Sequence, residues 1–531
     1  MKKTFFRLLL YPASCGVQRP SEEFVSCTVS LIEMSGKRDR NASTDQGAKR
    51  TDVDSKLGFL PRSHVEAKNN VEFGDEKDIG PFEDPFGDVI EDEEVDGNGD
   101  EDGDEEEGRD EDMEDVEPKK VFRPGIDRVE DGEELDYDPT AYDMLHRATV
   151  EWPCLSFDIL QDTLGAARKK FPHTAYVVAG TQADEHDRNR IYVMKWHKLH
   201  KTKHDGIDEE DREDESDDED EDEEGTDDDA ILDFRVIAHP GGVNRIRSMK
   251  QLPFVVATWA DTGRVQVWDL QAHLERLDKQ GAPPNPKVDP IYTFEGHSGE
   301  GFAMDFNPSV TGKFVTGDCK RFIYLHNPSE GGWTPDDTPF SEHKKSVEDV
   351  QWKKEGEGTG DVFASCSVDR SVRFWDVRRK KKSVLKIEDA HPADVNVLSW
   401  HPLDGKLLLT GGDEGAFKVF DVRNLEAGAM AHFKWHNAPI TSVDWHPADE
   451  AALAVSAADG MVSLWDLSVE EDDEVLAGQA KPEGAEHYPP QLLFLHQGQT
   501  DVKEVKWHQL IPGCVVSTAL DGFNIFKPSN L

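Results

Sequence analysis

Cysteine is scarce in this sequence, and its cysteines share no paired spacing. There are six, at positions 15, 27, 154, 319, 366 and 514. Several fall in strand-like stretches, so we expect a reduced intracellular setting and no disulfide framework. The sequence also lacks any apolar run that approaches the roughly 20 residues of a membrane span. We therefore expect no association with a membrane.

Positive charge is in short supply. Lys and Arg number 60 against 110 Asp and Glu, which gives a formal net charge of -50. This balance argues against direct binding of nucleic acid and favours a basic partner. Two runs, 91–115 and 205–229, carry about two thirds of the excess. Because like charges repel and almost nothing in these runs is apolar, we expect both to be disordered.

Patterns typical of catalysis and of metal binding are missing as well. No Cys or His pair has the short spacing of zinc ligands, apart from an isolated His197 and His200. The glycine-rich stretches 296–301 and 411–412 lie between short strands and open no helix, so a phosphate loop is not expected. His, Ser and Asp recur together, but once in every repeat, which indicates structural use. We predict no enzyme activity, no cofactor and no metal.

What the sequence does contain is a repeat, seen best in residues 365–378, which read Ser-Cys-Ser-Val-Asp-Arg-Ser-Val-Arg-Phe-Trp-Asp-Val-Arg. With His343 upstream, the order His, Ser, Asp, Trp is typical of one blade of a β-propeller. We expect a chain of buried hydrogen bonds, called a staple below, to join neighbouring strands. Two blades are predicted to carry a full staple: His343, Ser365, Asp369 and Trp375 in one, and His436, Ser456, Asp459 and Trp465 in the other.

Six such units follow one another, each opening with His and closing with an aromatic or aliphatic residue. The opening and closing residues are His239 and Trp268, His297 and Leu325, His343 and Trp375, His391 and Phe420, His436 and Trp465, and His496 and Phe526. Residues 174–199 read as a degenerate seventh unit. Leu155, Phe157 and Ile159 alternate with polar residues and predict a strand that completes the last blade and closes the ring. The predicted fold is all-β, a seven-bladed β-propeller.

Three regions are predicted along the chain. Residues 1–120 form a disordered acidic region, 121–154 a helical lead-in, and 155–531 the propeller. In the lead-in, Tyr142, Leu145 and the pair Trp152-Pro153 indicate a short helix. Within the propeller, the acidic run 205–229 interrupts the first blade, and an insertion at 470–490 leaves the sixth and ends in a Pro-Pro pair.

Two basic features of the chain have alternative interpretations. Residues 1–15 imitate a secretory signal, but Arg7 breaks the apolar core. This favours 1–33 as a spurious start and Met34 as the initiator. The run Arg-Arg-Lys-Lys-Lys at 378–382 is either a nuclear-import signal or a solvated loop between blades.

Several longer stretches resemble the glutamate-rich WD-repeat-containing proteins, over about residues 120–530. They are Tyr142-Asp143, His146-Arg147-Ala148, Cys154-Leu155-Ser156-Phe157-Asp158-Ile159, Ala179-Gly180-Thr181-Gln182, 296–303, 316–319, 492–498 and 517–520. The resemblance implies a WD-repeat propeller in a non-enzymatic protein of the nucleus and nucleolus. It also implies escort of a large-subunit ribosomal protein and, in animal members, binding of core histones.

The family is also similar to the retinoblastoma-binding histone chaperones, in which a helix before the first strand and a Pro-Pro loop from the sixth blade clamp a histone helix. The partner-binding residues that this resemblance implies are Tyr142, Leu145, Asp472, Asp473, Glu474, Pro489 and Pro490. One side of the clamp departs from the pattern, because Thr140-Ala141 stands where those chaperones have two bulky apolar residues. A histone helix would therefore lose apolar contact.

Three functional hypotheses follow. The leading one is a monomeric chaperone for a basic large-subunit ribosomal protein, and the second is a histone chaperone on chromatin. Both rest on the same electrostatics, and Thr140-Ala141 favours the first. The third comes from the stretches at 375–378 and 420–423, which resemble the WDxR box of substrate receptors for a cullin ubiquitin ligase. That resemblance implies binding to the ligase's propeller adaptor.

Overall fold

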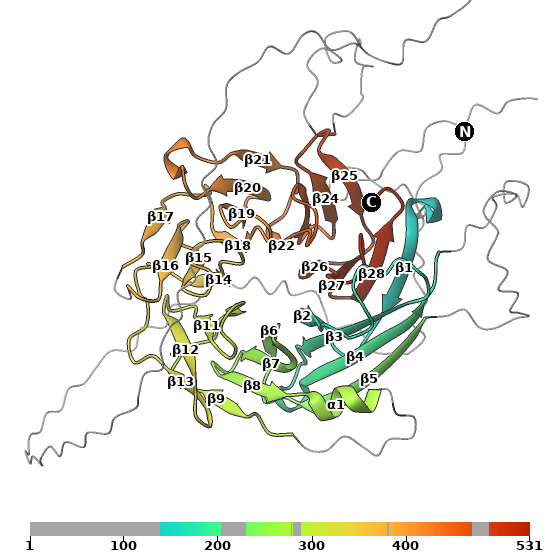
Figure 1. Ribbon diagram of the computed structural model, residues 1–531, viewed down its shortest axis with the longest axis horizontal. Helices are drawn as coiled ribbons and strands as arrows, with labels where there is room; N and C mark the ends of the chain where they lie inside the picture. Colours follow the sequence, from blue (N-terminus) through green and yellow to red (C-terminus); the bar gives the residue numbers. More distant parts are fainter. Residues whose placement is uncertain (1–137, 203–229, 278, 280–287, 380–381, 470–487) are drawn as a thin grey trace, which may run out of the picture. The chain divides into compact units, whose positions relative to one another are not determined.

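The computed structural model describes residues 138–202, 230–277, 279, 288–379, 382–469 and 488–531. All of these residues belong to one of the chain's two compact units. Their strands form seven antiparallel sheets of four strands each, arranged as blades around a common centre (Figure 1). The predicted seven-bladed β-propeller is thereby confirmed. The regions 1–120 and 205–229, and the residues Asp472, Asp473 and Glu474, lie outside the described part of the chain.

Six blades take their strands in chain order, from the innermost to the outermost. The first holds β2 (Cys154–Ile159), β3 (His173–Thr181), β4 (Arg190–Leu199) and β5 (Ile231–Ala238), and the second β6 (Val243–Met249), β7 (Leu252–Ala260), β8 (Val265–Asp269) and β9 (Tyr292–Phe294). The third holds β10 (Ala303–Phe306), β11 (Phe314–Gly317), β12 (Ile323–Ser329) and β13 (Gly332–Pro335), and the fourth β14 (Val347–Trp352), β15 (Val362–Ser367), β16 (Val372–Asp376) and β17 (Leu385–Ile387). The fifth holds β18 (Val395–Trp400), β19 (Leu407–Gly412), β20 (Ala416–Asp421) and β21 (Ala431–Lys434), and the sixth β22 (Ile440–Trp445), β23 (Ala452–Ala457), β24 (Val462–Asp466) and β25 (Leu492–His496).

The seventh blade is built from both ends of the described chain. Its inner strands are β26 (Glu504–Trp507), β27 (Val515–Ala519) and β28 (Gly522–Pro528), and its outermost strand is β1 (Tyr142–Ala148). β1 pairs antiparallel with β28, with Leu145 opposite Phe526. A 3-10 turn, Pro139–Ala141, leads into β1. The pairing fills the hydrogen-bonding edge that β28 would otherwise expose, and it locks the ring.

Two sequence predictions about this junction are wrong. The short helix predicted around Tyr142 and Leu145 is strand β1, and the only α-helix among the described residues is α1 (Gln271–Leu277), after β8. The strand at Leu155, Phe157 and Ile159 is β2, the innermost strand of the first blade, and does not close the last one. The reason is the free edge of β28, because a tertiary pairing partner overrides the weak local helix propensity of a short segment.

Neighbouring blades are joined by tryptophans at the ends of innermost strands. The indole N–H groups of Trp352, Trp400 and Trp445 each donate, at 3.2 Å, to a backbone carbonyl on the innermost strand of the preceding blade. All three side chains are buried. Truncating such a residue typically costs about 3–5 kcal/mol, so these indoles are a main source of contact between blades.

The fourth blade contains the complete staple. His343 Nδ1 donates to the Asp369 carboxylate at 3.2 Å, and His343 Nε2 lies 2.7 Å from the Ser365 hydroxyl. The Trp375 indole donates to the same hydroxyl oxygen at 2.8 Å. Burial alone would raise the pKa of Asp369, but hydrogen bonds from His343 and Ser371 hold it well below its usual range. Burial lowers the pKa of His343, so its ring is neutral.

The sixth blade uses a different serine from the predicted one. His436 bonds Asp459 at 3.0 Å, but its Nε2 and the Trp465 indole both meet Ser463, each at 2.8 Å. Ser456 instead contacts Thr441 at 3.0 Å. Side chains alternate along a strand, so Ser456, one residue beyond the staple position, points to the other face. Ser463 lies directly opposite the residue at that position, Val455, and supplies the hydroxyl from the neighbouring strand.

Replacing Asp369 by Ala is expected to destabilise the propeller by about 1–3 kcal/mol, because the buried His343 ring loses its acceptor. Urea unfolding followed by tryptophan fluorescence measures the change. Asp361→Ala is the control in the same blade: its carboxylate is 39% exposed and lies 3.6 Å from Arg378, so it should cost less than about 0.5 kcal/mol. Equal effects of the two substitutions would contradict a specific role for the staple.

Candidate functional site

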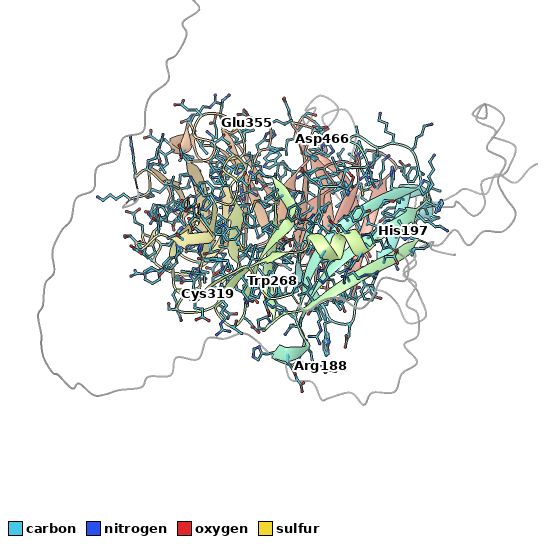
Figure 2. All side chains as sticks on the ribbon, turned by 60° about the horizontal axis from the view of Figure 1, so that its bottom comes forward. Arg188, His197, Trp268, Cys319, Glu355 and Asp466 are labelled. Carbon is cyan, nitrogen blue, oxygen red and sulfur yellow. The ribbon has the colours of Figure 1, made fainter. Side chains whose placement is uncertain are left out.

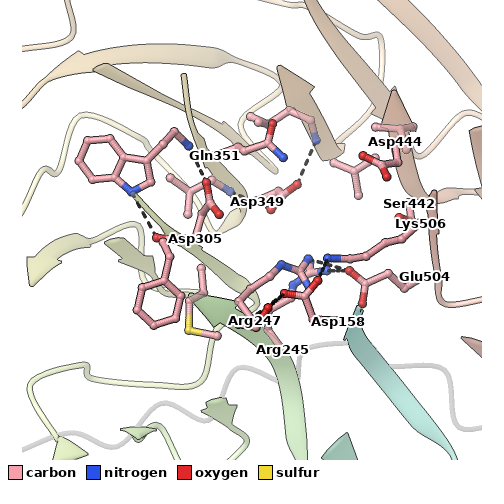
Figure 3. A pocket seen from close by; sticks show the side chains of 18 of the residues that line it. Asp158, Arg245, Arg247, Asp305, Asp349, Gln351, Ser442, Asp444, Glu504 and Lys506 are labelled. Atoms are coloured by element: carbon pink, nitrogen blue, oxygen red, sulfur yellow. Dashed lines mark hydrogen bonds and ion pairs between the residues drawn. The ribbon is translucent and has the colours of Figure 1, made fainter. Parts of the chain in front are cut away.

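The innermost strands of all seven blades surround a central channel. The space lined by them amounts to roughly 1020 Å³, open solvent at its mouth included. Charged side chains of both signs project into it (Figure 3). Arg247 pairs with Glu504 at 2.6 Å, and Lys506 pairs with Asp158 at 2.7 Å. The channel is therefore an ion-pair network between strands of different blades.

Glu504 is the centre of this network. Its carboxylate also accepts hydrogen bonds from the Ser156 hydroxyl at 2.8 Å and from the Phe157 backbone at 2.9 Å. Burial by itself would raise the pKa of Glu504, but Arg247, Lys506 and Arg245 lower it to about 2. One carboxylate thus ties the seventh blade to the first and second.

Other channel carboxylates connect neighbouring blades in the same way. Asp158 accepts from the Ser248 backbone at 2.7 Å, Asp305 from Trp352 at 2.8 Å, and Asp444 from Trp507 at 3.1 Å. In each case the acceptor and the donor lie on innermost strands of adjacent blades. These carboxylates are used as structural fasteners. The sequence reasoning missed them, although the spacing of two in Arg245/Arg247 and Glu504/Lys506 places each pair on one strand face.

Metal-binding and thiol chemistry have little support in the described residues. Within these, no group of three or more His, Cys, Asp or Glu side chains is placed to hold a metal ion. The described cysteines, Cys154, Cys319, Cys366 and Cys514, are free thiols. In the same part of the chain, no helix has the length and apolar character needed to cross a membrane.

Tyr142, predicted to contact a partner, is buried between the sixth and seventh blades. Its hydroxyl lies 2.8 Å from His496 Nδ1, and Asn524 donates to the other ring nitrogen at 2.9 Å. Its ring packs edge-on against Phe494 at 5.2 Å between centroids. Leu145 is half-buried in the same cluster. Tyr142, His496 and Asn524 thus form a staple that fastens the N-terminal strand to the last blade.

The described parts of the two sides of the predicted clamp are linked through the C-terminal residues. The Ala141 carbonyl accepts from the Ser529 backbone at 3.1 Å, and the Asn530 side chain donates to the Leu493 carbonyl at 3.0 Å. β1, β28 and β25 accordingly lie side by side (Figure 1). Pro489 and Pro490 open the turn into β25; Pro489 is half-buried and Pro490 exposed. The exposed or half-buried residues at this meeting point are called the junction surface below: Thr140, Ala141, Pro489, Pro490, Leu493 and Asn530.

Two of the acidic insertions leave the described structure near this junction. Thr202, shortly before the run 205–229, donates its backbone N–H to the Asp143 carbonyl of β1 at 2.9 Å. Val469, just before the insertion at 470, accepts from the Gln491 side chain at 2.8 Å. Asp466, at the end of β24, lies with Glu355 on one face of the ring, and Arg188 lies on the opposite face (Figure 2). Acidic sequence therefore joins the ring at two places beside the junction surface.

The two WDxR-like stretches each present an Asp–Arg ion pair. Arg378 pairs with Asp376 at 2.7 Å, and Arg423 pairs with Asp421 at 2.6 Å. The arginine side chains are 65% and 61% exposed. A hydrogen bond from each arginine lowers the pKa of its aspartate. The fourth and fifth blades therefore display the same charged pair at equivalent positions.

Comparison with known proteins assigns the chain to a family. Glutamate-rich WD repeat-containing protein 1 of Dictyostelium discoideum is 47% identical over 475 residues, which cover 87% of this chain and 98% of that protein. The chain belongs to the glutamate-rich WD repeat-containing family. Ribosome assembly protein rrb1 of Schizosaccharomyces pombe is 41% identical, over 85% of this chain and 93% of that protein. Protein HEAT STRESS TOLERANT DWD 1 of Arabidopsis thaliana is 45% identical, over 78% and 92%.

Models of protein families match parts of the chain. The WD domain, G-beta repeat, matches residues 334–376 and 429–466. The family model for histone-binding protein RBBP4 of the CAF1 complex matches residues 132–200, which include β1 and the first three strands of the first blade. Residues 358–447 match the WD40 domain of anaphase-promoting complex subunit 4. Residues 132–200 of this chain thus match a model of a histone-binding family.

Substituting Phe for Tyr142 is expected to cost about 1–2 kcal/mol of unfolding free energy, because His496 loses a buried hydrogen-bond partner. The matched control is Tyr488→Phe, since Tyr488 is half-buried and its ring lies tilted against Trp435, with 5.6 Å between ring centroids. Chemical denaturation of the two variants provides the comparison. If Tyr142→Phe proves as stable as the control, Tyr142 does not fasten the terminal strand.

The Glu504 network predicts a dependence on pH. The folded-state pKa of Glu504, about 2, lies below its ordinary value of 4.5, so its stabilisation is present above about pH 4.5 and is lost as the pH falls toward 2. Glu504→Gln should therefore be less stable at neutral pH, by on the order of 3 kcal/mol. The difference in unfolding free energy between Glu504→Gln and the parent chain should become smaller as the pH falls.

Urea unfolding at several pH values between 6 and 3 tests this expectation. Glu295→Gln is the control, because Glu295 is 63% exposed and pairs with Arg264 at the surface. A stability difference for Glu504→Gln that stayed constant over this range would show that the carboxylate's charge is not what stabilises the ring.

Proposed function

We propose that this chain is a non-enzymatic binding protein that escorts a basic protein of the large ribosomal subunit during ribosome assembly. Its relationship to ribosome assembly protein rrb1, at 41% identity over 85% of the chain, carries this proposal. A nuclear and nucleolar location follows from the same activity. We take the ring to act as a monomer, and its closure by β1 and β28 of a single chain supports this because no second chain is needed to complete it.

Electrostatics provide the means of recognition. The formal net charge is -50, and the acidic runs hold most of it. A ribosomal protein carries many Lys and Arg side chains, whose normal counter-charge is the RNA phosphate backbone. Acidic runs supply that counter-charge through many weak pairs, each worth little in water and all screened by salt. The client stays soluble and is released readily when RNA replaces the carboxylates.

Selectivity requires a shaped surface, and the junction surface supports that role. It combines half-buried apolar groups, Ala141 and Leu493, with exposed Pro490. The segments that precede the acidic sequences are bonded beside it, one to β1 and the other to Gln491, directly before β25. A client segment bound there would be surrounded by carboxylates, as expected of a site in which a fixed surface provides specificity and charge provides attraction.

Core histones are the second candidate clients. The match of residues 132–200 to the histone-binding family model favours them. Against tight clamping of a histone helix stands the small, polar pair Thr140-Ala141, which offers little apolar area. We therefore rank the ribosomal client first and histones second, with the latter activity exerted on chromatin.

Binding to the propeller adaptor of a cullin ligase is supported only by the Asp376–Arg378 and Asp421–Arg423 pairs. Pull-down of the adaptor, and its loss on combining Arg378→Ala with Arg423→Ala, tests this adaptor role. If the adaptor still binds after both substitutions, or does not bind the parent chain at all, the adaptor role is excluded.

Neutralising the run 205–229, by changing every Asp to Asn and every Glu to Gln, should weaken binding of basic clients by about ten-fold or more at low salt and much less at high salt. Loop length is preserved, so a lost tether does not account for the effect. The measurement is purification of the tagged chain from cells at low and high salt, with the bound proteins identified.

The control for this experiment removes opposite charges elsewhere on the ring, by changing the exposed Lys386 and Lys406 to Gln. Affinity that is the same for the neutralised run and the parent at every salt concentration would count against the electrostatic mechanism. Direct competition between a purified large-subunit ribosomal protein and H3–H4 tetramers for the chain then separates the two candidate clients.

A further inference from the structure

Ser383 lies at the outer edge of the fourth blade, immediately after the basic run 378–382. Its backbone N–H and its hydroxyl both donate to Glu342, at 2.8 and 2.6 Å. The following residue, Val384, donates to Phe374 and begins the pairing that continues as β17. Ser383 is therefore held in place by one carboxylate at the start of an edge strand, with five basic residues directly before it.

Arg373 lies beneath this serine and has spare hydrogen-bonding capacity. Its side chain is only 7% exposed, and its Nη1 lies 3.4 Å from both the Ser383 hydroxyl and the Glu342 carboxylate. Nη2 is 3.9 Å from Glu388. The buried Nε has no hydrogen-bond partner among the described residues. A guanidinium that is buried and only loosely paired is a ready binding group for a stronger anion.

We propose that Ser383 is phosphorylated by a protein kinase that selects basic residues on the N-terminal side of its target, and that Arg373 then holds the phosphate. In this step the Ser383 oxygen attacks the γ-phosphorus of ATP and the hydroxyl proton is transferred to the kinase's base. The bond from phosphorus to the bridging oxygen breaks, and ADP leaves. The inference is independent of which client the chain escorts.

Phosphorylation changes the surroundings of Ser383 in two ways. The hydroxyl can no longer donate to Glu342, and a group of charge about -2 repels that carboxylate and the neighbouring Glu388. Arg373 exchanges a carboxylate for a phosphate, with which a guanidinium forms bidentate bonds, while Lys382 and Lys386 add favourable charge. Because Glu342 directly precedes His343, the displaced segment is the one that carries the fourth blade's staple. Phosphorylation of Ser383 at the edge of the blade is thereby linked to the His343 staple in its core.

Incubating the full chain with the catalytic subunit of a basic-directed kinase and ATP, followed by mapping of phosphopeptides, tests the modification. Ser468 is an internal control: its backbone N–H and hydroxyl also donate to one carboxylate, Asp466, at 2.8 and 2.6 Å. Ser468 is exposed but has no basic residue among the five before it. We expect at least ten-fold more phosphate on Ser383 than on Ser468. Ser383→Ala should remove that phosphate, and equal labelling of the two serines, or none at Ser383, overturns the proposal.

The role of Arg373 is tested by ³¹P NMR titration of the phosphorylated chain. If Arg373 holds the phosphate on Ser383, the second pKa of that phosphate should be lower in the folded chain than in a phosphopeptide of residues 378–388, by about half a unit or more. Arg373→Lys should raise it toward the peptide value, whereas the exposed Arg423→Lys should not. A folded chain that titrates like the peptide rules out this role, whatever the stability of the Arg373 variant.

Discussion

The pairing of β1 with β28 is the interaction on which this fold depends. Each blade buries its faces against two neighbours, so the ring is stable only when the first and last blades are joined. β1 makes that joint by completing the seventh blade, and it is fixed there by hydrogen bonds and by the burial of Tyr142 against His496 and Phe494. The ring closes because the first described strand, β1, completes the last blade.

Polar groups inside the ring are used to hold blades together. The staples use His, Asp, Ser and Trp within a blade, and channel carboxylates tie several of the innermost strands to their neighbours. Charge in the channel is matched, with Glu504 against Arg247 and Asp158 against Lys506. The ring can therefore carry long acidic extensions without a charge imbalance at its centre. The charge-matched channel is thus distinct from the acidic sequences that carry most of the net charge.

The number of blades could be predicted from the sequence because six repeats each carry their own His, turn and closing aromatic or aliphatic residue, and residues 174–199 keep enough of the pattern to count as a seventh. The identity of the closing strand could not, since residues 142–148 have no strong period of their own and become a strand only through the edge of β28. The staple of the fourth blade was predictable from spacing. That of the sixth was not, because a shift of one residue turns Ser456 away and Ser463 replaces it from the adjacent strand.

The candidate site divides in the same way. A family resemblance indicated Tyr142 as a partner-binding residue, but its side chain is buried and bonded to His496. The contact between Ala141 and the C-terminal residues could not be seen in the sequence. Contacts between segments so far apart in the chain depend on how seven blades close, and local pattern carries no information about closure. The Glu504 network was missed for the same reason, because its partners come from three blades.

Joining the ends of the chain also sets an order of events during translation. β1 emerges from the ribosome several hundred residues before β28, its only pairing partner in the sheet. At about 5–20 residues per second, that interval lasts roughly 20 to 80 seconds. Throughout it, the nascent chain has an unpaired N-terminal strand and an unfinished ring. A message truncated shortly before the codons for β28 would thus yield a nearly complete polypeptide with two open strand edges, a substrate for chaperones and proteases in place of a working protein.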